Sequence, residues 1–195
     1  MGTLLDWLHV RNGAASYSGT PLVPFLHVAW YVPIEFMGAG AFVGFVRPEL
    51  DEELQRQASE ISLWTTLYGL ATLTFAWWAS GALHSWKVPS AAIASILTLV
   101  GVGTWAIFDL TRQGAIGAAI AAAAGVIAES LIVKTGTYRY TAPDVLDLVP
   151  QWLPSLYVVA CVAVGNMGRY MKYSWYPAPP VAASSQPAEA PRKAA

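Results

Sequence analysis

The chain has 195 residues, of which 55% are apolar and only 12% are charged, and its mean hydropathy is +0.45. This composition exceeds the apolar content of an ordinary soluble domain and predicts an all-α fold, a polytopic transmembrane helix bundle. The net charge of −1 argues against a nucleic-acid partner, because the chain has no basic patch to neutralise phosphates. The single cysteine, Cys161, excludes an intramolecular disulfide and a cysteine zinc cluster.

Residues 1–22 do not read as a signal peptide, because Asp6, His9 and Arg11 interrupt them and no apolar core or cleavage site follows. We expect a surface segment or a disordered segment here. Residues 23–173 are expected to form the transmembrane domain. Residues 174–195 are rich in Pro, Ala and Ser, which predicts a disordered C-terminal tail.

Five apolar runs have the length of a membrane span, about 20 residues. We predict transmembrane helices over residues 24–46, 60–83, 88–108, 114–133 and 150–171. The pair Arg47-Pro48 is expected to end the first of them. Only residues 109–113 separate the third and fourth helices, so we expect these two to lie antiparallel and side by side, as the core hairpin of the bundle.

The orientation follows from the basic residues of the connecting segments. One side carries Arg11, Lys87, Lys134 and Arg139, and the other carries Arg47, Arg56, Arg112, Arg169, Lys172, Arg192 and Lys193. The side richer in Lys and Arg faces the cytoplasm in most membrane proteins. We therefore expect the C-terminus and the 109–113 turn to be cytoplasmic.

Polar side chains at membrane depth are costly and are candidates for function. Glu35 lies within the first predicted helix, and His27 lies eight positions earlier, on roughly the same helix face. The two could form a proton relay or part of a ligand site. Alternatively, Glu35 is neutral and hydrogen-bonded to a neighbouring helix or faces a wet cavity, and His27 sits near the interface. For Glu129, near a helix end, a structural role is favoured.

The sequence shows no nucleophile elbow, HExxH, P-loop or paired-carboxylate constellation. We expect no enzyme activity, and therefore no catalytic residue, metal site or cofactor. Asp109 directly follows a long apolar span. Its structural interpretation is a cap on the next helix or a local pair with Arg112.

Several motifs, in order, resemble those of the INSIG (insulin-induced gene) family. Residues 103–114, GTWAIFDLTRQG, resemble the family signature GLWWTFDRSRSG, and residues 136–144, GTYRYTAPD, resemble NGVYQYTSPDF. Residues 152–154, WLP, and 164–169, VGNMGR, resemble SWLP and VGNIGRQ, and residues 29–33, AWYVP, resemble AWWVP. The resemblance extends over residues 29–170.

The resemblance implies six membrane helices around a lipid-accessible cavity. Animal members reside in the endoplasmic reticulum, bind oxysterol and hold the sterol-sensing proteins Scap and HMG-CoA reductase. Asp109 matches the signature aspartate that those proteins need for partner binding, in a loop that the family places in the cytosol. Trp105 matches a tryptophan of the sterol-responsive region.

The chain departs from the family pattern in three ways. The family's first helix is missing, and residues 1–22 stand in its place. Glu35 stands where the animal proteins carry cysteine, which predicts a more polar cavity. The segment after Asp109 has one basic residue fewer, which weakens the case for Scap binding. The Ala-, Gly- and Trp-rich composition suggests a bacterial homologue in the inner membrane; a eukaryotic one would lie in the endoplasmic reticulum.

Our leading hypothesis is a non-enzymatic, INSIG-like membrane protein that binds a lipid or sterol-like ligand in an intramembrane cavity and regulates a membrane protein partner. Candidate ligand-binding residues are Trp105, Phe108, Glu35 and Phe75; candidate partner-binding residues are Asp109 and Arg112. Self-association into a homo-oligomer is also expected. The alternative is a small proton-coupled transporter or membrane enzyme that uses Glu35, with His27 as its proton partner.

Overall fold

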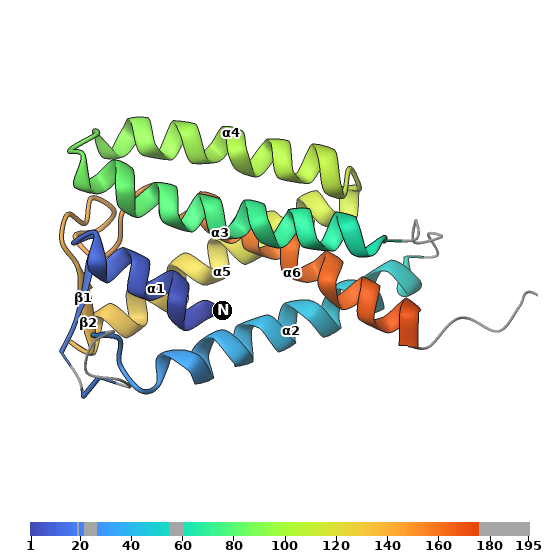
Figure 1. The fold of residues 1–195 in the computed structure, drawn as a ribbon, viewed down its shortest axis with the longest axis horizontal. Helices are drawn as coiled ribbons and strands as arrows, with labels where there is room; N and C mark the ends of the chain where they lie inside the picture. Colours follow the sequence, from blue (N-terminus) through green and yellow to red (C-terminus); the bar gives the residue numbers. More distant parts are fainter. Residues whose placement is uncertain (19, 22–26, 55–60, 176–195) are drawn as a thin grey trace, which may run out of the picture.

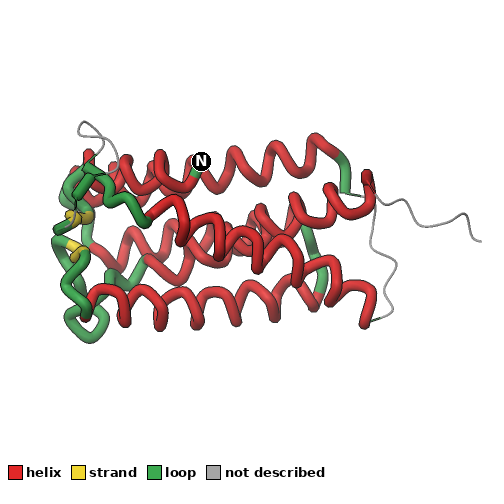
Figure 2. Tube along the Cα trace, turned by 90° about the horizontal axis from the view of Figure 1, so that it is seen from below, coloured by secondary structure: helices red, strands yellow, loops and turns green. Residues whose placement is uncertain are grey.

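The computed structural model describes residues 1–18, 20–21, 27–54 and 61–175. Its elements are α1 (Gly2–Arg11), β1 (Ala15–Tyr17), α2 (Val32–Glu53), α3 (Leu63–Ser85), α4 (Ser90–Phe108), α5 (Arg112–Lys134), β2 (Tyr138–Tyr140) and α6 (Leu153–Trp175). The strands form one antiparallel pair at one end of the helices (Figures 1 and 2). The predicted helix starts at residues 24 and 60, Arg56 and the tail from residue 176 lie outside the described residues.

Helix α6 is the centre of the bundle, and α2, α3, α4 and α5 all pack on it (Figure 1). Each of the four outer helices brings a glycine to its crossing with α6. The facing pairs are Gly44 with Gly168, Gly69 with Ala163, Gly101 with Val158, and Gly125 with Tyr157. Small residues let two helix backbones approach closely, which is how helices gain packing contacts within a membrane. The positions of these glycines therefore determine where the outer helices approach α6 most closely.

Helices α4 and α5 pack along α6 rather than along each other. The expected side-by-side hairpin at the core of the bundle is therefore wrong, although both helices and their short turn form where predicted. The physical reason is that α4 and α5 each bring a glycine to α6, where Gly101 accommodates Val158 and Gly125 accommodates the Tyr157 ring. In the most apolar 18-residue segment of each helix, only 22% of α4 and 6% of α5 is buried. Both helices therefore lie at the periphery of the bundle.

Helix α2 differs from its prediction at both ends. Residues 27–31 lie outside any helix, and the helix continues to Glu53 with Pro48 in its interior. A proline leaves the carbonyl four residues earlier without its helical hydrogen bond, and here that carbonyl belongs to Gly44. The backbone of Gly168 lies against this oxygen, so packing on α6 accommodates the proline. A continuous helix past Pro48 is the consequence.

The early non-helical segment also separates the proposed proton pair. His27 is exposed, with a positive φ of 52°, and precedes the start of α2. Glu35 lies in the first turn of that helix. The two residues therefore do not share a helix face, because the helical periodicity that related them does not extend back to His27.

Residues 2–11 form helix α1, which packs against both α2 and α3 (Figure 1). Leu5 and His9 are buried. The Nε2 atom of His9 lies 2.7 Å from the Ser80 hydroxyl, and the imidazole stacks on the Trp77 indole at 5.4 Å. This ordered helix differs from the surface or disordered segment that we expected. Its 10 residues extend about 15 Å, about half the thickness of a bilayer core.

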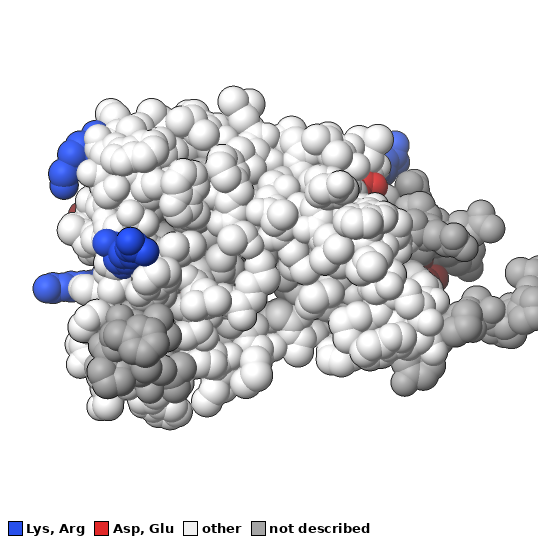
Figure 3. Space-filling view, in the orientation of Figure 1, with Lys and Arg blue, Asp and Glu red and all other residues white. Residues whose placement is uncertain are grey.

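The surface matches a membrane environment. Helices α4 and α5 are long and apolar enough to cross a bilayer by length and composition, with mean hydropathies of 2.0 and 2.1. In Figure 3, charged side chains appear only at the two ends of the molecule, and the broad middle of this face is uncharged. The prediction of an all-α transmembrane bundle is confirmed by the fold. That all five long helices cross the membrane stays a prediction.

Candidate functional site

Four buried charged side chains form a closed ring of ion pairs at the end of the bundle opposite the strands. Arg47 and Asp51 come from α2, Asp109 from the end of α4, and Arg169 from α6. Arg47 bonds Asp51 at 2.8 Å and Asp109 at 2.9 Å, and Arg169 bonds Asp109 at 3.2 Å and also pairs with Asp51. Their side chains are only 1–4% exposed. We call these four residues the charge ring.

Neutral groups extend the charge ring into the α4–α5 turn. The Thr111 hydroxyl donates to Asp109 at 2.7 Å and accepts from Arg47 at 2.8 Å. Asn166 donates to the Phe108 carbonyl at 2.8 Å. Removing a charge from water is costly unless the charge is paired and its hydrogen bonds are made, and the ring meets both conditions. The network thus joins α2, α6 and the turn into one unit.

The two candidate partner-binding residues, Asp109 and Arg112, differ in where their side chains lie relative to the charge ring. The Asp109 side chain points inward and is 1% exposed, whereas Arg112 is exposed and makes no ion pair with it among the described residues. Thr111, not Asp109, caps α5, by accepting from the Gly114 amide at 2.9 Å. Neither the cap nor the local pair that we considered for Asp109 forms.

Trp105 and Phe108 lie beside the same turn, and both are half-buried. The Trp105 indole nitrogen donates to the Thr111 carbonyl at 2.9 Å, which fixes the last turn of α4 against the turn that follows. Leu110 has a positive φ of 50° and is 67% exposed. The turn therefore presents an apolar tip while its acidic residue faces inward.

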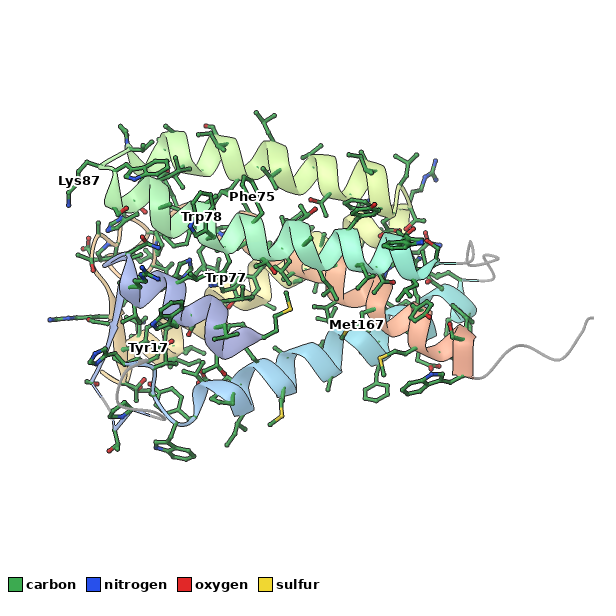
Figure 4. The ribbon with its side chains drawn as sticks, viewed as in Figure 1. Tyr17, Phe75, Trp77, Trp78, Lys87 and Met167 are labelled. Atoms are coloured by element: carbon green, nitrogen blue, oxygen red, sulfur yellow. The ribbon has the colours of Figure 1, made fainter. Side chains whose placement is uncertain are left out.

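Phe75 lies elsewhere, in the wall of an apolar pocket between α3 and α4 with a volume of about 210 Å³. Its lining is apolar and includes Phe75, Trp78, Trp86, Ile96, Leu97 and Val100. Figure 4 shows Phe75 and Trp78 together on α3, and their rings lie 5.8 Å apart. Phe75 and Trp78 are 54% and 41% exposed, so the pocket is open to the side of the bundle.

Glu35 lies apart from both of these places, in the first turn of α2. Burial raises the pKa of Asp6 to about 7, and the charge of Glu35 contributes to this shift. Tyr17 donates to Asp6, and Tyr157 donates to Glu129 at 2.7 Å. The four predicted ligand residues are therefore not brought together: Trp105 and Phe108 lie by the turn, Phe75 lies in the pocket, and Glu35 lies in the first turn of α2.

Sequence reasoning missed Arg47, Asp51 and Arg169. Arg47 and Asp51 are four positions apart, a spacing that places them on one helix face, but the expected helix end at Pro48 hid this relation. Arg169 was counted only for orientation, although it ends the motif VGNMGR, one of the segments that resemble the INSIG family. Asp6 was also missed, because residues 1–22 were not expected to enter the bundle.

A bundle of long apolar helices, with charges at its two ends or paired inside, defines an integral multi-pass membrane protein. No family model matches the chain. It is 29% identical over 173 residues to the insulin-induced gene 1 protein of Danio rerio, an alignment that covers 88% of this chain and 67% of that protein. It is 27% identical over 176 residues to the insulin-induced gene 2 protein of Gallus gallus, covering 88% and 75%.

The solved structures agree. A mycobacterial Insig homolog, MvINS from Mycobacterium vanbaalenii, superposes with a TM-score of 0.74 and 23% identity over 86% of each chain. A cross-linked MvINS trimer gives a TM-score of 0.75 and 22% identity, also over 86% of each chain. The chain is thus similar in sequence to the insulin-induced gene proteins, as its motifs predicted, and it shares its fold with a mycobacterial Insig homolog.

Proposed function

We propose that this protein binds a lipid or sterol-like molecule within the membrane and regulates a membrane protein partner. The observation that carries the proposal is the apolar pocket between α3 and α4. At about 210 Å³ it is smaller than the roughly 300 Å³ at which ligand-enclosing pockets begin. A ligand would bury one face against Phe75 and the neighbouring tryptophans, and its other face would remain available to a partner.

The α4–α5 turn supports a separate contact with the partner. Because Asp109 is buried, its role is to position the turn rather than to touch the partner. The contacting side chains are the exposed Ile107, Leu110 and Arg112. The assignments of Trp105, Phe108 and Glu35 as ligand contacts stay predictions. The proposed activity needs no bond-making chemistry, in keeping with a regulatory rather than an enzymatic role.

We also propose that the chain self-associates, since MvINS has been captured as a cross-linked trimer. The outer face of α5 supports this, because Ile116, Ile120 and Ile127 are all more than 60% exposed. The proposed location is the bacterial inner membrane, with the charge-ring end and the C-terminus in the cytoplasm. The count of Lys and Arg residues on the two sides supports that orientation.

The test is photo-crosslinking of membranes with a diazirine-bearing sterol and a diazirine-bearing phospholipid, followed by peptide mapping. We expect one probe to label α3 and α4 peptides at the pocket, and Phe75→Ala to lower that labelling several-fold. Leu99→Ala is the matched control, because Leu99 is 74% exposed on α4 and does not line the pocket. Uniform labelling of all lipid-facing helices by both probes would overturn the proposal.

The alternative, a proton-coupled activity at Glu35, has an observation in its favour: the charge of Glu35 contributes to the raised pKa of Asp6 on α1. His27 is not on the same helix and cannot act through helical spacing. The two functions separate in liposomes loaded with a pH-sensitive dye. Proton flux that Glu35→Gln abolishes supports the alternative, and lipid labelling that survives in Glu35→Gln supports the leading proposal.

A further inference from the structure

Helix α2 presents a continuous stripe of exposed side chains to the outside of the bundle. The members of this stripe follow one another at intervals of three and four residues, and all are exposed: Glu35, Gly38, Phe42, Phe45, Glu49 and Glu52. This spacing places them on one helix face, and it is the pattern along which two helices pack lengthwise. Phe42 and Phe45 are 69% and 75% exposed, so no helix of the described chain covers the centre of the α2 stripe.

Helix α5 presents a stripe with the same spacing. Its exposed members are Ile116, Ile120, Ala123 and Ile127. The three isoleucines are 62%, 63% and 61% exposed, and the exposed alanine between them leaves a shallow place on the helix surface. Small residues let a neighbouring helix approach closely. The large phenyl rings of the α2 stripe and the small residue of the α5 stripe are therefore complementary in size.

The two stripes also end in opposite charges. The α2 stripe begins with Glu35 at the strand end and reaches Glu52 at the charge-ring end. Helix α5 begins with Arg112 at the charge-ring end and ends with Lys134 at the strand end. The two helices run in opposite directions between these ends (Figure 1). When α2 of one copy lies beside α5 of a second copy with the same orientation in the membrane, an acidic residue therefore meets a basic one at both ends.

These charges are not balanced within one copy. At the charge-ring end, Glu49 and Glu52 share a single ammonium group, that of Lys172, at 2.7 and 2.9 Å. A carboxylate beside lipid-exposed apolar side chains is costly without a counter-charge. Three further charged residues are exposed and form no ion pair within the part of the chain that the structure describes: Glu35, Arg112 and Lys134.

The lengths of the two helices agree with this pairing. At 1.5 Å per residue, the distance from Glu35 to Glu52 along α2 is about 26 Å, and that from Arg112 to Lys134 along α5 is about 33 Å. With the centres of the two helices aligned, the acidic and basic residues at each end are about 4 Å apart along the helix axes. Long Lys and Arg side chains can extend over that distance.

We propose that α2 of one copy packs lengthwise on α5 of a second copy. The inference rests on the self-association proposed above and names its interface. The contact joins two different faces, so each copy uses its α2 stripe toward one neighbour and its α5 stripe toward another. Repetition of such a contact gives a closed oligomer when the rotation closes. No residue that lines the α3–α4 pocket belongs to α2 or α5, so the pocket stays accessible to lipid in the assembly.

The test is oxidative disulfide cross-linking of the full chain in membranes. Aligning the helix centres places Phe42 close to Ala123 of the second copy, so we expect Phe42→Cys combined with Ala123→Cys to give covalent oligomers. Each variant alone should give none, because the two positions lie on opposite sides of the contact. Phe42→Cys with Leu99→Cys is the matched control, since Leu99 is 74% exposed on α4. The native Cys161 is buried and should not cross-link.

A charge exchange tests the ion pair at the strand end. Glu35→Lys should lower the yield of this cross-link several-fold, because it places two cations together. Adding Lys134→Glu should restore the yield. Adding Lys87→Glu instead, at an exposed lysine between α3 and α4, should leave the yield low.

Three results would overturn the inference: equal cross-linking through Leu99 and Ala123, cross-linking by Phe42→Cys alone, or no restoration by Lys134→Glu. Native mass spectrometry of the wild type separates this inference from the self-association on which it rests. Oligomers that do not cross-link between Phe42→Cys and Ala123→Cys overturn the interface alone, whereas a purely monomeric protein overturns both proposals.

Discussion

One nitrogen of the Arg47 guanidinium bonds both carboxylate oxygens of Asp109, at 2.9 and 3.0 Å, across 62 positions of the sequence. Both side chains are at least 96% buried. This contact ties the interior of α2 to the turn that follows α4, and Arg169 of α6 joins it at 3.2 Å. Asp109 can therefore control the shape of the turn without contacting a partner.

Replacing Asp109 by Asn should strongly destabilise the protein. The substitution leaves two buried arginines with a single carboxylate, and breaking a buried ion pair typically costs about 3–5 kcal/mol. The measurement is the thermal unfolding midpoint in detergent, followed by tryptophan fluorescence. Arg112→Gln is the control, because Arg112 is exposed and lies three positions away. If both variants unfold at the wild-type temperature, the ring does not stabilise the fold.

Thr111→Ala should cost more than Ser62→Ala, although both remove a helix cap. Ser62 caps α3 by accepting from the Thr65 amide at 3.0 Å, on the surface, and its loss should cost about 1 kcal/mol. Thr111 caps α5 and in addition bonds Arg47 and Asp109, so its loss should cost roughly twice as much. Urea or thermal unfolding of both variants in the same detergent gives the comparison. Equal losses would mean that the two additional bonds of Thr111 contribute nothing.

A methyl group on Gly168 should disrupt the crossing of α2 and α6. An added Cβ at Gly168 would overlap the Gly44 carbonyl, a backbone atom that cannot move aside. We expect Gly168→Ala to lower the unfolding temperature and the yield of folded protein. Gly103→Ala is the opposite case, because nothing lies within 4 Å of an added Cβ there. It should stabilise α4 by about 0.5–1 kcal/mol through helix propensity. A tolerated Gly168→Ala would contradict the close crossing.

Asp6→Asn should change how stability depends on pH. Burial raises the pKa of Asp6 from 3.8 to about 7, so the folded protein keeps a proton that the unfolded chain has already lost. Between about pH 4 and pH 7 this difference lowers the stability of the wild type as the pH rises. The asparagine side chain carries no charge, so the variant should match the wild type near pH 4 and be more stable at pH 8.

Thermal midpoints of the wild type and Asp6→Asn, taken at intervals from pH 4 to pH 8, test this prediction. Glu53→Gln controls for the loss of one acidic residue at an exposed position. A constant difference between Asp6→Asn and the wild type at every pH would show that Asp6 is ionised in the folded protein throughout this range.

Composition and the lengths of the apolar runs were enough to predict the class of the protein and the positions of its long helices. Apolar runs of span length predicted five helices, and the structure has a helix in each. The ends of the last four lie within a few residues of the prediction, because span length and the polar turns limit where such helices can begin and end. The motifs around Asp109 and residues 164–169 predicted the similarity to the insulin-induced gene proteins.

Which residues contact one another depends on how the helices pack, and this could not be predicted from the sequence. Arg47, Asp51, Asp109 and Arg169 are dispersed over three segments, and nothing local indicates that their charges cancel in one buried ring. The packing of α1 against α3, which brings Asp6 next to Trp77, is equally invisible in the sequence. Periodicity and hydropathy indicate which residues of one segment face an apolar environment. Ion pairs and ligand sites depend on contacts between segments, which these patterns do not indicate. Those contacts depend on the packing of α2, α3, α4 and α5 on α6.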